Sequence, residues 1–200
     1  MAVEFKGGLE LKRTLYLILV IVVTIVLSMN SAFATGNSSD GYFTIALINA
    51  GRNSLIDSYE DVFSGFSSDE LEELKQKASF RFFASPNEMN SFQTMYISDF
   101  EETIGIVSEN GEIKNLTLIT SYGYPCSDPT NYEEVILFFG IMSFLNTGYM
   151  QIGKTTDSFP YDDFIRDLEL KPQFSYELGN VSLMYTKMDD IHSVYGFKAL

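Results

Sequence analysis

Cys126 and His192 are the only cysteine and the only histidine of the chain, so they come first as candidates for chemistry. A thiol and an imidazole within hydrogen-bond reach can form a nucleophilic pair, and Asp189 or Asp190 could hold the imidazole. His192 lies in a segment without a pattern, and we therefore predict no catalytic residue. A single cysteine outside the cytoplasm can also pair between chains, which makes Cys126 a candidate for a disulfide-linked dimer.

Three tyrosines, Tyr122, Tyr124 and Tyr132, surround Cys126 in the sequence. Tyrosine offers a large contact area together with a hydroxyl group and is common at recognition surfaces. We predict a binding surface formed by Tyr122, Tyr124, Cys126 and Tyr132. The alternative is that these tyrosines only cover the end of a sheet and a buried helix.

Metal and cofactor sites find little support in the residue types. A zinc site needs several Cys or His ligands, and one of each cannot supply it. Acidic residues gather in segments 69–73, 162–167 and 189–190. Solvated helix faces are the ordinary explanation of the first two, with a weak calcium site as the alternative. We predict no metal.

Residues 148–155 (GYMQIGKT) match the phosphate-binding pattern G-x-x-x-x-G-K-[ST]. That chemistry needs a strand before the loop and a helix directly after it. Pro160 follows too soon for a long helix to start at the loop. We therefore interpret the string as a chance match in a surface loop and predict no cofactor.

The N-terminal segment has the pattern of a secretory signal peptide. Lys12 and Arg13 precede an apolar run over residues 15–27, and Ala32 and Ala34 form an A-x-A cleavage site. We expect residues 1–34 to be removed and the rest to be secreted or extracytoplasmic, without a stable membrane span. The alternative is a domain tethered by the uncleaved segment, although a span needs about 20 apolar residues.

Charge and size restrict the function classes. The chain has 13 Lys+Arg against 27 Asp+Glu, a formal net charge of −14. The electrostatic field of this negative charge repels the phosphate backbones of nucleic acids, so we expect no nucleic-acid partner. With a single cysteine, no disulfide can form within the exported part. Its stability must therefore come from the hydrophobic core. Small secreted domains are often rich in disulfides, so this feature fits a bacterial product better.

Hydrophobic periodicity predicts helices at both ends of a strand-rich region. Residues 55–66 have helical spacing with Asn53 as the cap, and a capping box at Ser67–Glu70 opens a helix to Ala78. The apolar residues 42–50 fit a strand or a helix equally well. Residues 131–146 predict a central buried helix, and Ser158 and Pro160 start another.

Strands are predicted at residues 80–84, 92–98, 103–108, 113–120, 174–178 and 181–187. Asn110-Gly111 and Gly179-Asn180 join two pairs of them as hairpins. Tight turns rather than helical crossovers predict an α+β fold, with an antiparallel sheet of about five strands and helices packed on one face. The expected organisation is a signal peptide (1–34), a flexible leader (35–41), one α+β domain (42–188) and a C-terminal tail (189–200).

These patterns favour a non-catalytic binding or interaction domain for a protein or peptide. The alternatives are a hydrolase-type enzyme that uses clustered carboxylates or Cys126, and an inhibitor of an exported protease. Carboxylates that converge in one cleft would favour the enzyme. An exposed aromatic patch or a free sheet edge would favour the binding domain.

Overall fold

The computed structural model describes residues 41–84, 94–109, 112–121 and 130–200. The predicted signal peptide and most of the predicted leader lie outside these ranges; Gly41 already belongs to the first described helix. In the described parts the protein is α+β, with five helices and seven strands. The helices are α2 (Gly41–Ser58), α3 (Glu60–Phe63), α4 (Ser68–Ala78), α5 (Tyr132–Gly153) and α6 (Tyr161–Leu170). The strands are β1 (Arg81–Ala84), β2 (Thr94–Ile97), β3 (Thr103–Glu109), β4 (Glu112–Thr120), β5 (Gln173–Leu178), β6 (Val181–Lys187) and β7 (Ser193–Ala199).

One antiparallel sheet contains all seven strands, in the order β1-β2-β3-β4-β7-β6-β5. It consists of two meanders, β1–β4 and β5–β7, that meet where β4 pairs with β7. The sequence predicted about five strands in the sheet, fewer than the seven that it contains. The strand that the sequence did not predict is β7, which falls in the expected tail and lies inside the sheet between β4 and β6.

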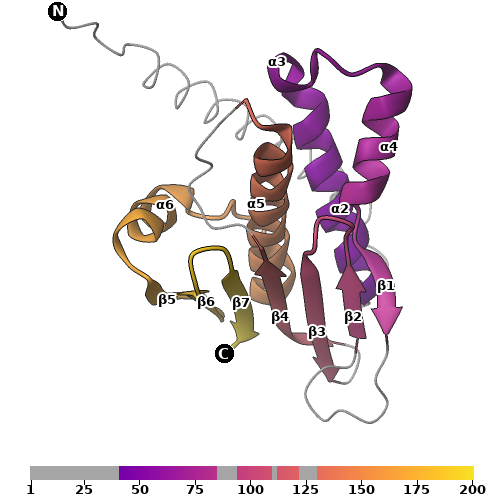
Figure 1. Ribbon diagram of the computed structural model, residues 1–200. Helices are drawn as coiled ribbons and strands as arrows, with labels where there is room; N and C mark the ends of the chain where they lie inside the picture. Colours follow the sequence, from indigo (N-terminus) through magenta and orange to yellow (C-terminus); the bar gives the residue numbers. More distant parts are fainter. Residues whose placement is uncertain (1–40, 85–93, 110–111, 122–129) are drawn as a thin grey trace, which may run out of the picture. The chain divides into compact units, whose positions relative to one another are not determined.

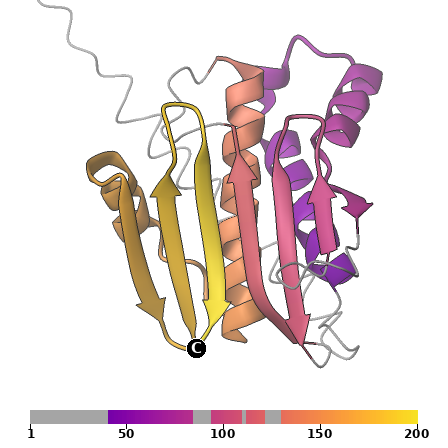
Figure 2. The same cartoon turned by 60° about the horizontal axis from the view of Figure 1, so that its bottom comes forward.

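The sheet carries its helices on one face (Figures 1 and 2). Helix α5 packs on β4, β7 and β6, and α2 packs on α5. Phe144 of α5 contacts the ring of Phe197 of β7 at 5.8 Å between centroids. A Cβ atom at Gly148 would lie 2.5 Å from Phe197, so glycine lets the helix approach the strand this closely. The expected one-sided arrangement of helices and the central buried helix are confirmed.

Helix α2 is longer than the sequence suggested. Asn53 is not a cap but lies inside the helix, because the undecided segment 42–50 is helical and continues into residues 51–58. Buried Ile45, Ile48, Leu55 and Ile56 give the helix one apolar side along its whole length.

Local signals for the start of α4 and for the two hairpins are confirmed in the described residues, while Asn110-Gly111 of the first turn lies outside them. Helix α4 begins with the predicted capping box, in which Ser67 and Glu70 each accept from the other's backbone N–H. The strands of both predicted hairpins pair, β3 with β4 and β5 with β6. Gly179 of the second turn has φ +63°, a conformation that favours glycine.

Helix α5 continues to Gly153, beyond the predicted end at Asn146. The interpretation of residues 148–155 as a surface loop was therefore wrong: Gly148–Gly153 are helical, and Lys154 ends the helix in the left-handed region at φ 51°. Among the described helices, α5 is long and apolar enough to cross a membrane by length and composition, but 83% of its most apolar stretch is buried inside the protein. It is the core helix of the domain.

A buried ion pair joins the helical layer to the sheet. Arg52 of α2 and Glu102, just before β3, are both 0% exposed and contact each other at 2.8 Å. Arg52 also donates to the carbonyl of Ala78 at the end of α4 and lies over the ring of Phe80 at 4.7 Å. Glu102 accepts a bond of 3.0 Å from the Ser98 hydroxyl. Helix α2, the end of α4 and the β2–β3 turn are thereby held together.

Candidate functional site

Several chain reversals meet at one end of the sheet because of its register. Ile97 pairs with Thr103, Thr103 with Ile119, Ile119 with Val194 and Val194 with Thr186. The β2–β3 turn, the end of β4 and the β6–β7 turn therefore lie at the same end. Helix α5 also begins there, since Asn131 and Tyr132 at its start line the same pocket as Ser121 at the end of β4.

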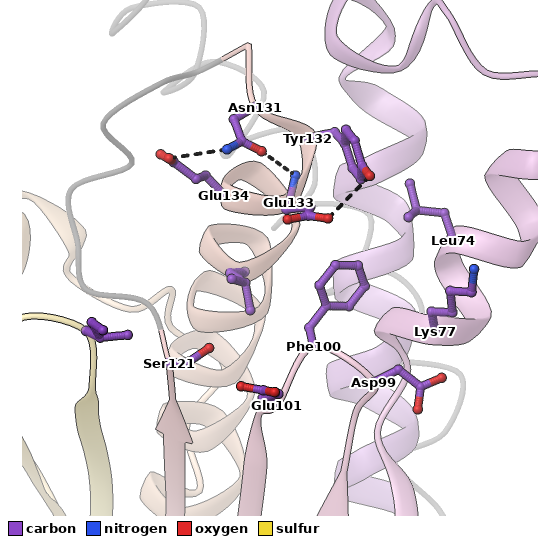
Figure 3. A pocket seen from close by; sticks show the side chains of 12 residues that line it. Leu74, Lys77, Asp99, Phe100, Glu101, Ser121, Asn131, Tyr132, Glu133 and Glu134 are labelled. Carbon is purple, nitrogen blue, oxygen red and sulfur yellow. Dashed lines mark hydrogen bonds between the residues drawn. The ribbon is translucent and has the colours of Figure 1, made fainter.

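A cleft of about 620 Å³ lies at this end of the sheet (Figure 3). Its walls come from α4, the β2–β3 turn, the end of β4, the start of α5 and the β6–β7 turn. The lining residues are Leu74, Lys77, Asp99, Phe100, Glu101, Ser121, Asn131, Tyr132, Glu133, Glu134, Leu137 and Ile191. Figure 3 shows Phe100 and Glu101 below the first turn of α5, which provides Tyr132 and Glu133.

Apolar and aromatic side chains form part of the wall. Leu74, Phe100, Leu137 and Ile191 line it, and Ile191 is 59% exposed. Tyr132 packs edge-on against Phe66 at 5.2 Å between ring centroids, and its hydroxyl donates to Glu133 at 3.3 Å. The cleft can thus contact an apolar group of a ligand.

Acidic groups dominate the charge of the cleft. Among the described residues that line it, the four carboxylates belong to Asp99, Glu101, Glu133 and Glu134, and the one lysine, Lys77, pairs with Glu73 on the same helix at 2.7 Å. Asp99 pairs with Arg81 of β1. Within the described ranges, neither Glu101 nor Glu133 forms an ion pair. The cleft therefore has a net negative charge.

The start of α5 explains why acidic residues are stable there. Asn131 caps the helix, and its side-chain oxygen accepts from the backbone N–H of Glu133 at 3.1 Å. Its amide group donates to Glu134 at 3.4 Å. The positive end of the helix dipole favours carboxylates in the first turn. The helix thus favours two carboxylates at the edge of the cleft.

The β2–β3 turn has a strained residue. Glu101 has φ 59°, which costs a non-glycine residue about 1–2 kcal/mol. The turn is closed by a bond of 3.1 Å from the Ser98 N–H to the Glu102 carbonyl, and Asp99 donates its N–H to the carbonyl of Lys77 at 2.9 Å. Since Glu102 is also anchored to Arg52, the turn is held firmly while it presents Phe100 and Glu101 to the cleft.

The β6–β7 turn is organised by Asp189. Its carboxylate accepts from the backbone N–H groups of Ile191 and His192, each at 2.7 Å, and contacts Nδ1 of His192 at 2.7 Å. These backbone bonds lower the pKa of Asp189 to about 2. Of the two acids considered from the sequence, Asp189 holds His192, while Asp190 pairs with Lys187 at 3.3 Å. The result is a defined turn that places Ile191 at the cleft.

Of the four binding residues predicted from the sequence, Tyr132 lines the cleft. Tyr122, Tyr124 and Cys126 lie outside the described residues, so the disulfide-linked dimer and the thiol–imidazole pair stay hypotheses. Sequence reasoning missed Phe100, Glu101 and Ile191. Their positions in turns gave no signal, because only the sheet register brings these turns together.

The metal and nucleotide candidates can be compared with the described geometry. No group of three or more His, Cys, Asp and Glu side chains that could hold a metal ion occurs in the described part of the chain. Lys154, the lysine of the phosphate-binding string, pairs with Glu112 of β4 at 2.8 Å. Because the glycines before it are helical, their N–H groups do not form a phosphate-binding loop there.

Comparison with protein-family models, with curated proteins and with solved structures finds no match to this chain.

Proposed function

We propose that this protein is an extracytoplasmic, non-catalytic binding domain that recognises a protein or peptide through the cleft at the end of the sheet. The ligand segment would present a basic side chain next to an apolar one. The proposal includes export by residues 1–34 and a binding role for Tyr122, Tyr124 and Cys126 together with Tyr132.

The cleft itself supports this proposal. Its volume of about 620 Å³ lies within the range of ligand-binding sites, and its walls combine aliphatic and aromatic groups with carboxylates. Glu101 and Glu133 have no cationic partner among the described residues, so a bound cation would neutralise charge that the fold leaves uncompensated. Phe100, Tyr132 and Ile191 offer apolar contact to the neighbouring residue of the ligand.

A hydrolase that uses carboxylates is the second candidate, because four carboxylates line one cleft. General acid catalysis would need a carboxyl group that stays protonated near neutral pH while in reach of substrate. Burial raises the pKa of Glu102, against the opposing effects of Arg52 and Ser98. Glu102 is 0% exposed, however, and so cannot contact a substrate. The carboxyl group whose pKa burial raises is therefore not available as a general acid, and the enzyme rests only on the four carboxylates that line the cleft.

Nuclear magnetic resonance with a model peptide tests the proposal. The probe is the synthetic peptide Gly-Ser-Leu-Arg-Leu-Ser-Gly, compared with the same peptide carrying uncharged citrulline in place of Arg. Amide signals of residues around the cleft should shift with the Arg peptide, and citrulline should weaken binding at least fivefold. The variant Glu101→Gln/Glu133→Gln should weaken it similarly, whereas Glu169→Gln, on the exposed side of α6, should not.

Shifts that are absent, or equal for the Arg and citrulline peptides, would contradict recognition of a basic group. Mass spectrometry of the same mixture tests the second candidate. Cleavage of the peptide by the native chain but not by the Glu101→Gln/Glu133→Gln variant would support the hydrolase instead.

A further inference from the structure

The face of the sheet opposite the helices is not covered by any described residue (Figure 2). Along β6 and β7 the side chains alternate between buried and exposed positions. Buried Leu183 and Phe197 point to α5, and their neighbours Met184 and Lys198 therefore belong to the outer face. Met184 is 44% exposed there.

This outer face is unusual in its charge. The chain has 27 acidic residues. The outward positions of the central strands β4, β7 and β6 nevertheless contain no Asp or Glu, apart from the first and last residue of each strand. These positions are Asn115, Thr117 and Ile119 of β4, Val194, Gly196 and Lys198 of β7, and Ser182, Met184 and Thr186 of β6. Two acidic molecules could approach each other here without direct repulsion between carboxylates.

Lys198 is the exception among the basic residues that the structure describes. The other nine Lys and Arg side chains of the described ranges each form an ion pair with Asp or Glu. Lys198 is exposed and forms none. In a protein of net charge −14, an unpaired cation on strands whose outward positions contain no carboxylate indicates a partner that supplies the negative charge.

An unpaired carboxylate of the matching geometry exists on the same face. Glu177 of β5 is exposed and forms no ion pair with a described residue. Glu177 pairs in register with Ser182 of β6, and Ser182 pairs with Lys198 of β7. Glu177 and Lys198 therefore lie on either side of β6, each about 4.8 Å from it.

This arrangement is complementary to itself. When a second copy lies face to face on the first, with a two-fold axis along β6 in the plane between the sheets, β5 of each copy lies over β7 of the other. Glu177 of each copy then faces Lys198 of the other copy, and Met184 lies close to the axis. A two-fold interface requires this reciprocity: when Glu177 of the first copy contacts Lys198 of the second, Lys198 of the first copy contacts Glu177 of the second.

We propose that the outer face of β5–β7 is a dimer interface, occupied by a second copy of this chain through two reciprocal Glu177–Lys198 ion pairs around Met184. Three strands of six or seven residues form a patch of roughly 14 by 24 Å, which is smaller than a standard specific interface and is the size expected of a weak, transient one. The dimer is therefore reversible and depends on protein concentration.

Sedimentation velocity of the full chain, as recovered from an exporting host and kept in reductant, tests the proposal. Reductant removes any disulfide through Cys126 from the result. The wild type should shift from monomer to dimer as its concentration rises, and Lys198→Glu or Glu177→Lys should each weaken the dimer at least tenfold. The double swap Lys198→Glu/Glu177→Lys should restore the dimer to within about threefold of the wild type.

Two matched controls change charge by the same amount elsewhere. Lys171→Glu and Glu169→Lys, both at exposed positions of α6 or its end, should leave association unchanged, and circular dichroism should confirm that every variant is folded. A wild type that stays monomeric overturns the proposal. If the dimer persists in both Lys198→Glu and Glu177→Lys, the proposal is also overturned and the dimer forms through another surface. The same conclusion follows if the double swap does not restore the dimer.

Discussion

Replacement of Glu102 by Gln should be among the most destabilising single changes of polar residues in the described part of this protein. The substitution keeps the shape of the side chain and removes its charge. The guanidinium of Arg52, 2.8 Å from that carboxylate, stays charged because arginine does not lose its proton in proteins. Since both side chains are 0% exposed, water cannot replace the lost partner.

The expected cost follows from the burial of the pair. Loss of one partner of a buried ion pair typically destabilises a protein by about 3–5 kcal/mol, because the other charge stays buried without a partner. The burial that raises the pKa of Glu102 disfavours its charged form and offsets part of this cost. Total stabilities of domains are about 5–15 kcal/mol, so this is a large fraction. For a domain of this size, 1 kcal/mol shifts the melting temperature by about 2–4 °C, which predicts a decrease of roughly 6–20 °C.

Thermal and urea unfolding, followed by circular dichroism, measure this cost. The matched control is Lys77→Gln, which breaks the Lys77–Glu73 pair; these side chains are 53% and 64% exposed, and the expected cost is at most about 1 kcal/mol. The double variant Arg52→Met/Glu102→Gln removes the uncompensated charge. It should cost less than the sum of the two single variants by about 1–3 kcal/mol.

Two results would refute this reasoning. If Glu102→Gln costs no more than Lys77→Gln, the buried pair does not hold α2 to the β2–β3 turn. If the costs of the two single variants simply add, Arg52 and Glu102 stabilise the fold independently, Arg52 through the Ala78 carbonyl and the Phe80 ring.

Two further predictions concern the helix layer and the β6–β7 turn. Gly140→Ala should destabilise the fold by about 1–3 kcal/mol in urea unfolding, because the new Cβ would lie 1.8 Å from a guanidinium nitrogen of Arg52; Gly65→Ala, with open space around it, is the matched control. The Asp189 carboxyl should titrate near pH 2 by carbon-13 resonance. Because this pKa is lower when folded than its ordinary value of 3.8, the stability that it contributes is present above pH 3.8 and is lost as the pH falls toward 2. Asp189→Asn should remove that pH dependence, and a titration midpoint near 3.8 in the native protein would contradict the assigned bonds.

Sequence reasoning succeeded where short segments determine their own structure. The Ser67–Glu70 capping box needs residues only three positions apart, and it starts α4 as predicted. The pairs of strands joined by short turns, β3 with β4 and β5 with β6, are equally local. The one-sided helix layer also followed from local patterns, since tight turns rather than helical crossovers between the strands predict an antiparallel sheet with helices on one face.

The wrong predictions concern residues whose structure depends on contacts with distant segments of the chain. Strand β7 has polar Ser193 at an inward position and apolar Val194 at an outward one, and these two residues obscure the alternation that runs from Tyr195 to Lys198. Its hydrogen bonds go to β4 and β6 on both sides, so the neighbouring strands stabilise it more than its own propensity. Asn53 resembled a cap, but its helix starts earlier because the side chains of residues 45–56 pack continuously against α5.

The candidate site depends on the same long-range pairing. Tyr132 was selected from its residue type and its neighbours in the sequence, whereas Phe100 and Ile191 join it only because β2–β3 and β6–β7 turn at the same end of the sheet. Without β7 in the sheet, the turn that carries Ile191 has no defined position, and without the Arg52–Glu102 pair the turn that carries Phe100 and Glu101 loses its anchor. It follows that Glu102→Gln should weaken binding of the Arg peptide even in the fraction of protein that stays folded, although Glu102 itself cannot touch the ligand.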